Sequence, residues 1–163
     1  MIGYLIGKVV ESFEEELILV TSSGVGYQVF FSNRAVCGDQ IEVFIKHIKR
    51  ENSEDLYGFL SFVEKRVFEL LLGVKGIGPK SAFNLVNQVG IEKLANAILF
   101  QEKKILTSVA GIGPKAAAQI LLDLGPKIEK IKSLLLEKED KNVGFESLIG
   151  EEQQEKLFGQ GAG

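Results

Sequence analysis

A five-residue motif, Gly-Ile-Gly-Pro-Lys, occurs at residues 76–80 and again at residues 111–115. Glycine just past the end of a helix permits left-handed backbone at little steric cost. Proline suits the first position of the next helix, because its φ is already set and the amide that it lacks would be unpaired there. The amides left free at such a turn attract anions, and the lysine adds a full positive charge. The motif is therefore suited to binding a phosphate group.

Each copy of the motif lies between two segments with the apolar spacing of helices. These segments cover residues 67–74 and 82–89 around the first copy, and residues 105–109 and 116–124 around the second. The pattern predicts two helix-hairpin-helix units, each holding one nucleic-acid phosphate through main-chain amides, a contact that carries no sequence information. A tight turn between packed helices would explain one copy. Two copies at the spacing of a helix pair favour a phosphate-binding pair that grips both backbones of a duplex.

The candidate DNA contacts are the glycines, isoleucine and lysine of each motif. The glycines and isoleucines would contribute main-chain amides, and the lysines would contribute charge. The candidates are Gly76, Ile77, Gly78, Lys80, Gly111, Ile112, Gly113 and Lys115. Lys75 and Lys127 are weaker candidates, because a solvated surface lysine explains each of them at least as well. Loss of Lys80 or Lys115 is expected to weaken binding equally across DNA sequences and to reduce the salt slope by ~1.

The charge of the chain is concentrated where these contacts are expected. The 163 residues are 45% hydrophobic and 25% charged, as in a globular protein with one large or two small domains. The net charge is −3, but residues 63–127, which hold both motifs, carry nine Lys/Arg against five Asp/Glu. Residues 1–62 carry five against nine, and residues 128–163 five against eight. The central segment is thus the basic one, as phosphate binding requires.

The sequence also predicts the cellular compartment. No apolar run approaches the ~20 residues that span a membrane, and no N-terminal signal peptide is visible. The single cysteine, Cys37, cannot form an intrachain disulfide and is expected to be a small half-buried residue. Sparse cysteine usage fits a reducing cytoplasm.

Residues 1–59 alternate apolar and polar positions between glycine and asparagine turns. The expected strands are residues 2–10, 17–21, 27–31, 40–49 and 56–59. Several short strands with regular turns in about sixty residues indicate a small closed barrel. An OB-fold is the first choice, and an SH3-like barrel is the alternative.

Helical spacing begins at Ser61, a predicted N-cap with Glu64 three residues further on. It continues to residue 138 as five or six helices, with breaks expected at Gly90 and at the Gly125-Pro126 pair. Four phenylalanines of this part are expected in the core rather than as platforms for base stacking. They are Phe62, Phe68, Phe83 and Phe100.

The predicted fold class is α+β, with three consecutive segments. Residues 1–62 form an OB-fold-like barrel, and residues 63–138 form an all-α tandem helix-hairpin-helix domain. Residues 139–163 form a charged linker and a short tail rich in glutamine and glutamate, which is expected to be flexible.

The barrel, the paired motifs and their order resemble the RuvA family, the Holliday-junction-binding subunits of the bacterial branch-migration complex. The resemblance covers residues 1–135. Besides the two motifs, the matching stretches are Met1–Gly7, Gly24–Tyr27, the Arg50-Glu51 pair and Leu56–Phe59.

This resemblance implies a homotetramer that holds a four-way DNA junction open and planar on a positive face, with one or two tetramers around the DNA. It implies recruitment of a RuvB-like hexameric AAA+ ATPase, with a RuvC-like resolvase as a further candidate partner. It also implies no catalytic activity and no cofactor or metal. The composition agrees, since the chain has one histidine, no CxxC pair and no Walker motif. His47 is expected to be a structural or surface residue rather than a general base.

Two alternatives come from other classes of protein. A repair enzyme, such as a glycosylase or a nuclease subunit, uses the same hairpins but needs a catalytic Asp or Lys or metal carboxylates beyond them. Asp123 is the only acid in the helix after the second motif, and a surface role is expected for it. An assembly adaptor without DNA binding is the other alternative, which the two intact motifs disfavour.

The sequence departs from the family pattern at two places. The β-hairpin before the Leu-Tyr-Gly-Phe run carries two adjacent acids in the family, which project into the junction as a pin. The matching residues here are Glu51 and Asn52, and the nearby Glu54 and Asp55 are expected to compensate in part. The family also ends in a small three-helix domain that contacts RuvB, for which the residues after Lys141 are too few. We therefore expect a reduced or truncated contact region at residues 139–163.

Overall fold

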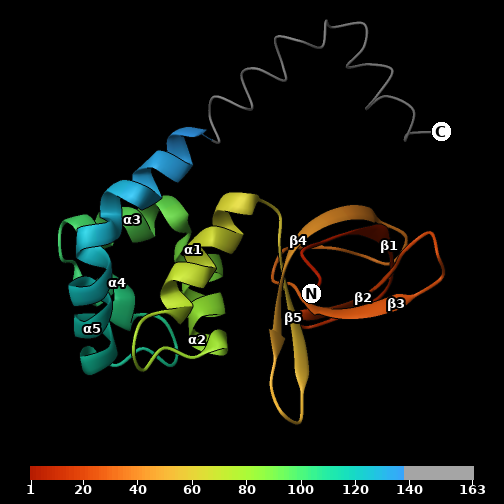
Figure 1. The fold of residues 1–163 in the computed structure, drawn as a ribbon, viewed down its shortest axis with the longest axis horizontal. Helices are drawn as coiled ribbons and strands as arrows, with labels where there is room; N and C mark the ends of the chain where they lie inside the picture. The colour runs from red at the N-terminus through yellow and green to blue at the C-terminus, as the bar shows by residue number, and fades with distance from the viewer. Residues whose placement is uncertain (138–163) are drawn as a thin grey trace, which may run out of the picture. The chain divides into compact units, whose positions relative to one another are not determined.

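The computed structural model describes residues 1–137, and the predicted tail at residues 139–163 lies outside them. Residues Met1–Ile128 form one compact unit, and a second unit begins at Glu129. In the first unit a five-stranded barrel is followed by helices (Figure 1). Within residues 1–137, no helix has the length and apolarity needed to cross a membrane.

The barrel is closed, and its strands follow one another around it in the order β1-β2-β3-β5-β4. Their bounds are β1 Tyr4–Phe13, β2 Glu16–Val20, β3 Gly26–Phe30, β4 Gln40–Lys49 and β5 Glu54–Phe59. β3 and β5 pair in parallel, and the other pairs are antiparallel. The predicted OB-like barrel is confirmed. β1 runs three residues further than expected, because an irregularity between Val9 and Glu11 lets it bend and continue its pairing with β2.

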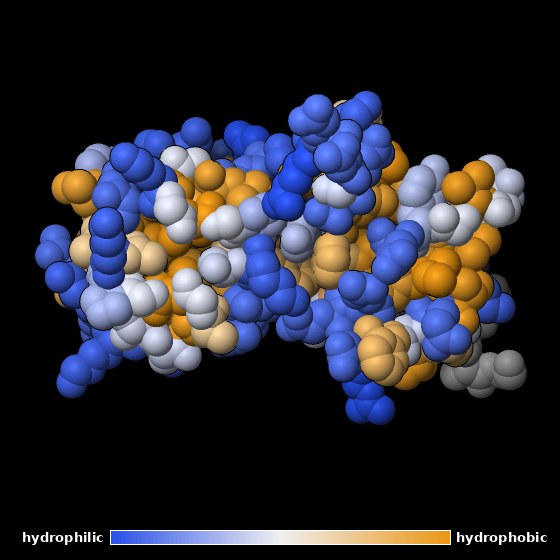
Figure 2. Space-filling model, turned by 90° about the horizontal axis from the view of Figure 1, so that it is seen from below, coloured by the Kyte–Doolittle hydropathy of each residue, from blue (hydrophilic) through white to orange (hydrophobic). Residues whose placement is uncertain are grey.

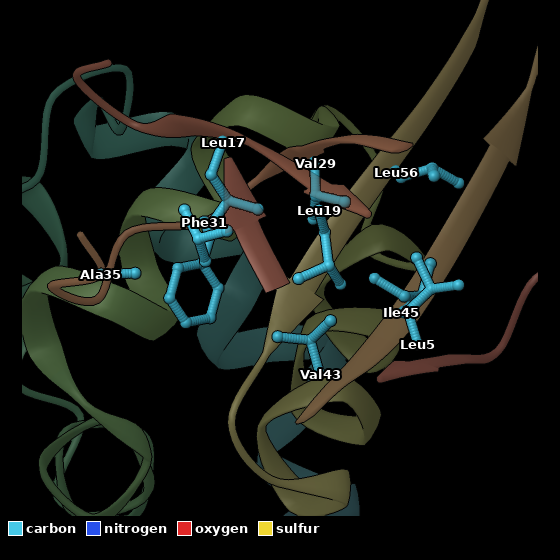
Figure 3. Packing of buried hydrophobic residues seen from close by; sticks show 10 residues of the cluster. Leu5, Leu17, Leu19, Val29, Phe31, Ala35, Val43, Ile45 and Leu56 are labelled. Carbon is cyan, nitrogen blue, oxygen red and sulfur yellow. The ribbon is translucent and has the colours of Figure 1, made fainter. Parts of the chain in front are cut away.

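Alternate residues along the strands fill the barrel, as their apolar spacing predicts. Leu17, Leu19, Val29 and Val43 converge in Figure 3, and each is at most 3% exposed. Gly58 lets β5 approach β3 closely, because a Cβ atom at this position would lie 2.8 Å from Cγ1 of Val29. All the residues of this buried cluster lie within residues 1–59, so this part of the chain supplies the barrel core.

The helical part contains five α-helices and two short turns of other helical types, followed by helix at residues 128–137. Their bounds are α1 Phe62–Leu72, α2 Pro79–Asn84, the π-helical turn η1 Leu85–Val89, α3 Ile91–Leu99, α4 Lys103–Thr107, α5 Pro114–Leu124 and the 3₁₀ turn η2 Gly125–Lys127. Ser61 caps α1 as predicted: its Oγ accepts from the Glu64 amide at 3.2 Å, and the Glu64 carboxylate accepts from the Ser61 amide at 3.1 Å. The break expected at Gly125 is only a tightening to 3₁₀ geometry.

The phenylalanine prediction is correct for two residues and wrong for two. Phe68 and Phe83 are fully buried and pack against Tyr57 of β5 at 5.2 and 5.4 Å between ring centroids. Phe62 is 47% exposed at the start of α1, where its ring meets Phe44 with 5.9 Å between centroids and Arg66 lies over it. Phe100 is 68% exposed, because the chain leaves α3 there.

Cys37 is exposed, and the expectation of a half-buried side chain is wrong. It lies between β3 and β4, beside Gly38, whose φ of 101° turns the chain back toward β4. Its Sγ lies 3.3 Å from the carbonyl oxygen of Val10.

Candidate nucleic-acid interface

The first motif forms the predicted turn between α1 and α2. Gly76 has a φ of 89°, and Pro79 is the first residue of α2. The Ile77 amide donates to the Val74 carbonyl at 3.1 Å, and the Ile77 side chain is buried. The turn is therefore closed by its own backbone and anchored in the core by its isoleucine.

The second motif repeats this geometry between α4 and α5. Gly111 has a φ of 88°, Pro114 begins α5, and the Ile112 amide donates to the Val109 carbonyl at 3.1 Å. Gly113 has φ and ψ of −87° and 176°, against −88° and 171° for Gly78 in the first motif. The two turns thus have the same backbone conformation, and the predicted pair of helix-hairpin-helix units is confirmed.

Each turn leaves amides free for an acceptor outside the protein. Helices cannot satisfy their first N–H groups internally. Among residues 1–137, no acceptor pairs with the amides of Gly78, Lys80 and Ser81 at the first turn, or of Gly113, Lys115 and Ala116 at the second. The isoleucine amides, expected to contact DNA, already donate inside the turns. DNA contact by the motif residues stays a prediction, with the isoleucines as anchors and the glycine and lysine amides as donors.

The two turns are held at a fixed spacing by direct contact. A Cβ atom at Gly111 would lie only 2.8 Å from the Ser81 Oγ. The second turn therefore packs against the start of α2, in the first hairpin. A fixed spacing between two amide sites suits a ligand whose phosphates are themselves regularly spaced, such as a DNA backbone.

The two motif lysines have different surroundings. The Nζ of Lys80 lies 2.6 Å from Oε2 of Glu15 in the turn between β1 and β2, and 5.9 Å from the centroid of the Phe30 ring. Lys115 is exposed, and no carboxylate of residues 1–137 pairs with it. The acidic run at residues 14–16 was visible in the sequence, but nothing there places Glu15 beside a lysine 65 residues away.

The hairpin between β4 and β5 carries the predicted pin residue at its tip. The Arg50 amide donates to the Ser53 carbonyl at 2.8 Å, which leaves Glu51 and Asn52 as an exposed two-residue loop. In Figure 1 this hairpin extends beyond the barrel, toward the same side as both motif turns. Seen from that side in Figure 2, a band of hydrophilic surface crosses the middle of the protein.

Glu54 does not supply the second acid at this tip. Its Oε2 lies 3.0 Å from Nε2 of His47, and its Oε1 lies 3.7 Å from Nζ of Lys49, so the carboxylate is directed back along the strands. Nδ1 of His47 accepts from the Ile2 amide at 3.2 Å. His47 therefore has the structural role predicted for it, and the tip carries the Glu51 charge without help from Glu54.

Asp123 has a hydrogen-bond partner on its own helix. Asp123 lies on α5 and accepts from the Gln119 side chain at 2.8 Å. In the part of the chain that the structure describes, no three His, Cys, Asp or Glu residues gather closely enough to hold a metal ion.

A closed five-stranded barrel followed by two helix-hairpin-helix turns defines a class of helix-hairpin-helix proteins with an OB-like N-terminal domain. The family model described as "RuvA N terminal domain" matches residues 1–58, and "SAM-like Helix-hairpin-helix tandem" matches residues 68–126. The chain belongs to the RuvA family.

Similar proteins are named Holliday junction branch migration complex subunit RuvA. The one from Halothermothrix orenii is 42% identical over 132 residues, which are 79% of this chain and 68% of the relative. The one from Maridesulfovibrio salexigens is 37% identical over 138 residues, 82% of this chain and 68% of the relative. The one from Finegoldia magna is 35% identical over 134 residues, 80% of this chain and 67% of the relative.

Proposed function

We propose that this protein is the Holliday-junction-binding subunit of a branch migration complex. The observation that carries the proposal is the similarity to proteins of that name across both the barrel and the hairpin region. The two turns with matching backbone and free amides supply the chemistry for holding phosphates. As a junction-holding subunit the protein needs no catalytic group, cofactor or metal of its own.

In this proposal each subunit grips one duplex arm. The turn at residues 76–80 holds a phosphate of one backbone, and the turn at residues 111–115 holds a phosphate of the other. Because only phosphates are contacted, binding is independent of base sequence and weakens as salt rises. A homotetramer would present one such grip to each arm of a four-way junction and keep the junction open and planar.

The pin contributes repulsion rather than attraction. A carboxylate about 4 Å from a phosphate costs ~1 kcal/mol in water-like dielectric, and more where solvent is excluded. Glu51 from four subunits at the crossover would hold separated strands apart and oppose continuous duplex. Because Asn52 carries no charge, discrimination against linear duplex is weaker than with two acids per tip.

The proposed partners follow from the same role. They are a RuvB-like hexameric AAA+ ATPase, which would pull the duplex arms, and a RuvC-like resolvase as a further candidate. The names of the relatives place those proteins in a complex. The region proposed to contact the ATPase, residues 139–163, lies outside the described residues. A cytoplasmic location and an assembly of one or two tetramers complete the proposal.

A gel-shift titration tests this function. A synthetic four-way junction is compared with linear duplex of the same arm sequence at two salt concentrations. A strong preference for the junction that weakens as salt rises is the expected result. Equal affinity for both would leave a general duplex-binding protein and contradict the proposal.

The repair-enzyme alternative is disfavoured, because the similarity to RuvA proteins covers the barrel as well as the hairpins. The same DNA incubated with protein and Mg²⁺ separates the two. Intact strands and bases are expected, whereas cleavage at a defined position would support an enzyme.

A further inference from the structure

Lys80 does not extend freely from the first hairpin. Its Nζ forms an ion pair with Glu15 at 2.6 Å and lies 5.9 Å from the Phe30 ring, so two groups of the barrel hold it. The backbone of Glu15 and the ring of Phe30 each have a partner in the barrel. The Glu15 carbonyl accepts from the Phe31 amide at 2.8 Å, and the Phe30 ring stacks on Tyr57 with 4.8 Å between centroids. The positive charge of Lys80 therefore already has a negative partner inside the protein.

Lys115 is the residue of the second hairpin that corresponds to Lys80. The backbone around it is the same, but its side chain has no carboxylate partner among residues 1–137. The difference between the hairpins thus lies in charge and not in turn geometry. Its origin is the acidic turn of the barrel, which reaches the first hairpin only.

We propose that Glu15 is an internal counter-charge that withholds Lys80 from DNA phosphates and makes the second hairpin the stronger phosphate site. This inference rests on the proposed junction binding. A phosphate at the first hairpin has to compete with a carboxylate that is tethered to the protein and already in contact. While that ion pair persists, Lys80 neutralises no phosphate and releases no counterion from the DNA.

Glu15 only partly withholds Lys80 from a DNA phosphate, because exposed ion pairs are individually weak. The side chains of Lys80 and Glu15 are 60% and 40% exposed. Each arm of the junction is therefore held firmly on one backbone and more loosely on the other. A loosely held backbone suits DNA that has to move past the protein.

Glu15→Gln tests the proposal directly, with Glu14→Gln as the matched control. Both variants remove one negative charge from the same turn, but Glu14 forms no ion pair among the described residues. Binding of a fluorescent four-way junction is measured by anisotropy over a series of salt concentrations. Glu15→Gln should steepen the slope of log K against log salt by up to about 0.9 for each subunit that engages the DNA. At the lowest salt it should tighten binding about two- to fivefold per engaged subunit beyond Glu14→Gln.

Lysine variants show whether the effect passes through Lys80. Lys80→Met should lower the slope less than Lys115→Met does in the natural sequence, and it should abolish the steepening in the Glu15→Gln background. Lys115→Met should lower the slope by about 0.9 per engaged subunit in either background. Thermal unfolding of each variant verifies that the fold is retained.

The outcomes separate the two proposals. If Lys115→Met lowers the slope while Glu15→Gln and Glu14→Gln behave alike, the counter-charge is refuted and junction binding stands. The counter-charge is also refuted if the gain from Glu15→Gln persists without Lys80. If the natural protein shows no salt-dependent junction binding at all, the proposed function itself fails.

Discussion

Glu51 and Asn52 form the two-residue loop of the β4–β5 hairpin, and only Glu51 is charged. Asn52→Asp should raise the preference for junction over linear duplex about fivefold, because each added carboxylate near a phosphate costs ~1 kcal/mol at about 4 Å. Glu51→Gln should lower the preference by a similar factor. Competition gel shifts with both DNAs measure the ratio.

Glu14→Gln serves as the control for this pair, since it removes a charge far from the hairpin tip in the sequence. An unchanged junction preference and branch-migration rate in Glu51→Gln would show that Glu51 is only a solvated turn residue.

Tyr57 is expected to make the free energy of unfolding depend on pH in the alkaline range. Burial raises the pKa of its hydroxyl above the ordinary value of 10.0, and the negative charge of Asp55 raises it further against a smaller lowering by Arg50. The folded protein then holds this proton more tightly than the unfolded chain. Its contribution to stability is complete below pH 10 and is lost as the pH rises through the folded pKa.

Tyr57→Phe removes the titrating hydroxyl. The free energy of unfolding of this variant should therefore fall less between pH 8 and pH values above 10 than that of the natural protein. Denaturant unfolding at pH 8 and at pH values above 10 measures this, with Tyr27→Phe as the control for a tyrosine on β3. Identical alkaline losses in the natural protein and Tyr57→Phe would contradict the assignment.

At the scale of the element, two glycines of the first hairpin turn are expected to affect different properties when they are replaced. One replacement should change stability, and the other should change DNA binding. Gly76 has a φ of 89°, so Gly76→Ala should cost about 1 kcal/mol of unfolding free energy through backbone strain. Gly78 has an ordinary φ, and an added Cβ would meet nothing within 4 Å, so Gly78→Ala should leave stability almost unchanged. In the proposed site that methyl group points to where a phosphate approaches, and DNA affinity should fall.

Denaturant melts and junction titrations on both variants measure the two effects. A Gly78→Ala protein with natural affinity for DNA would show that the amides of this turn are not the phosphate ligands.

Local elements of this fold could be predicted from sequence because they depend on local rules. Strand β4, the capping box at Ser61 and the start of α2 at Pro79 follow from residue type and spacing. That the isoleucine amides close the two turns could not be predicted, because a glycine-rich motif does not reveal which amide donates within its turn. The partner of Lys80 could not be predicted, since Glu15 approaches it only after the barrel and α2 have packed together.

At the scale of the whole molecule, the barrel carries apolar side chains on its outside as well as inside. On β1, Tyr4, Ile6 and Val10 are 44%, 49% and 46% exposed. These side chains share the outward face of β1 with the exposed Lys8, and we expect them to contribute to the contact in the proposed tetramer.

Ile6→Lys should therefore shift the protein from tetramer toward single chains of 17.9 kDa, because it places charges in that contact. Light scattering after gel filtration measures the mass. Leu122→Lys, on α5 and 70% exposed, is the control and should leave the mass unchanged. A tetramer that survives Ile6→Lys would exclude this face as the subunit contact.

The closure of the barrel constrains how such an assembly can be made. β1 pairs with β4 through residues 4–8 and with β2 through residues 8–13, so both halves of this strand are hydrogen-bonded within the barrel. Copies of the protein that meet through the outward side chains of Tyr4, Ile6 and Val10 would leave these pairings in place. Their contacts can form and dissociate without any backbone hydrogen bond being broken, so an assembly could be taken apart and rebuilt on a new DNA molecule while every barrel stays folded.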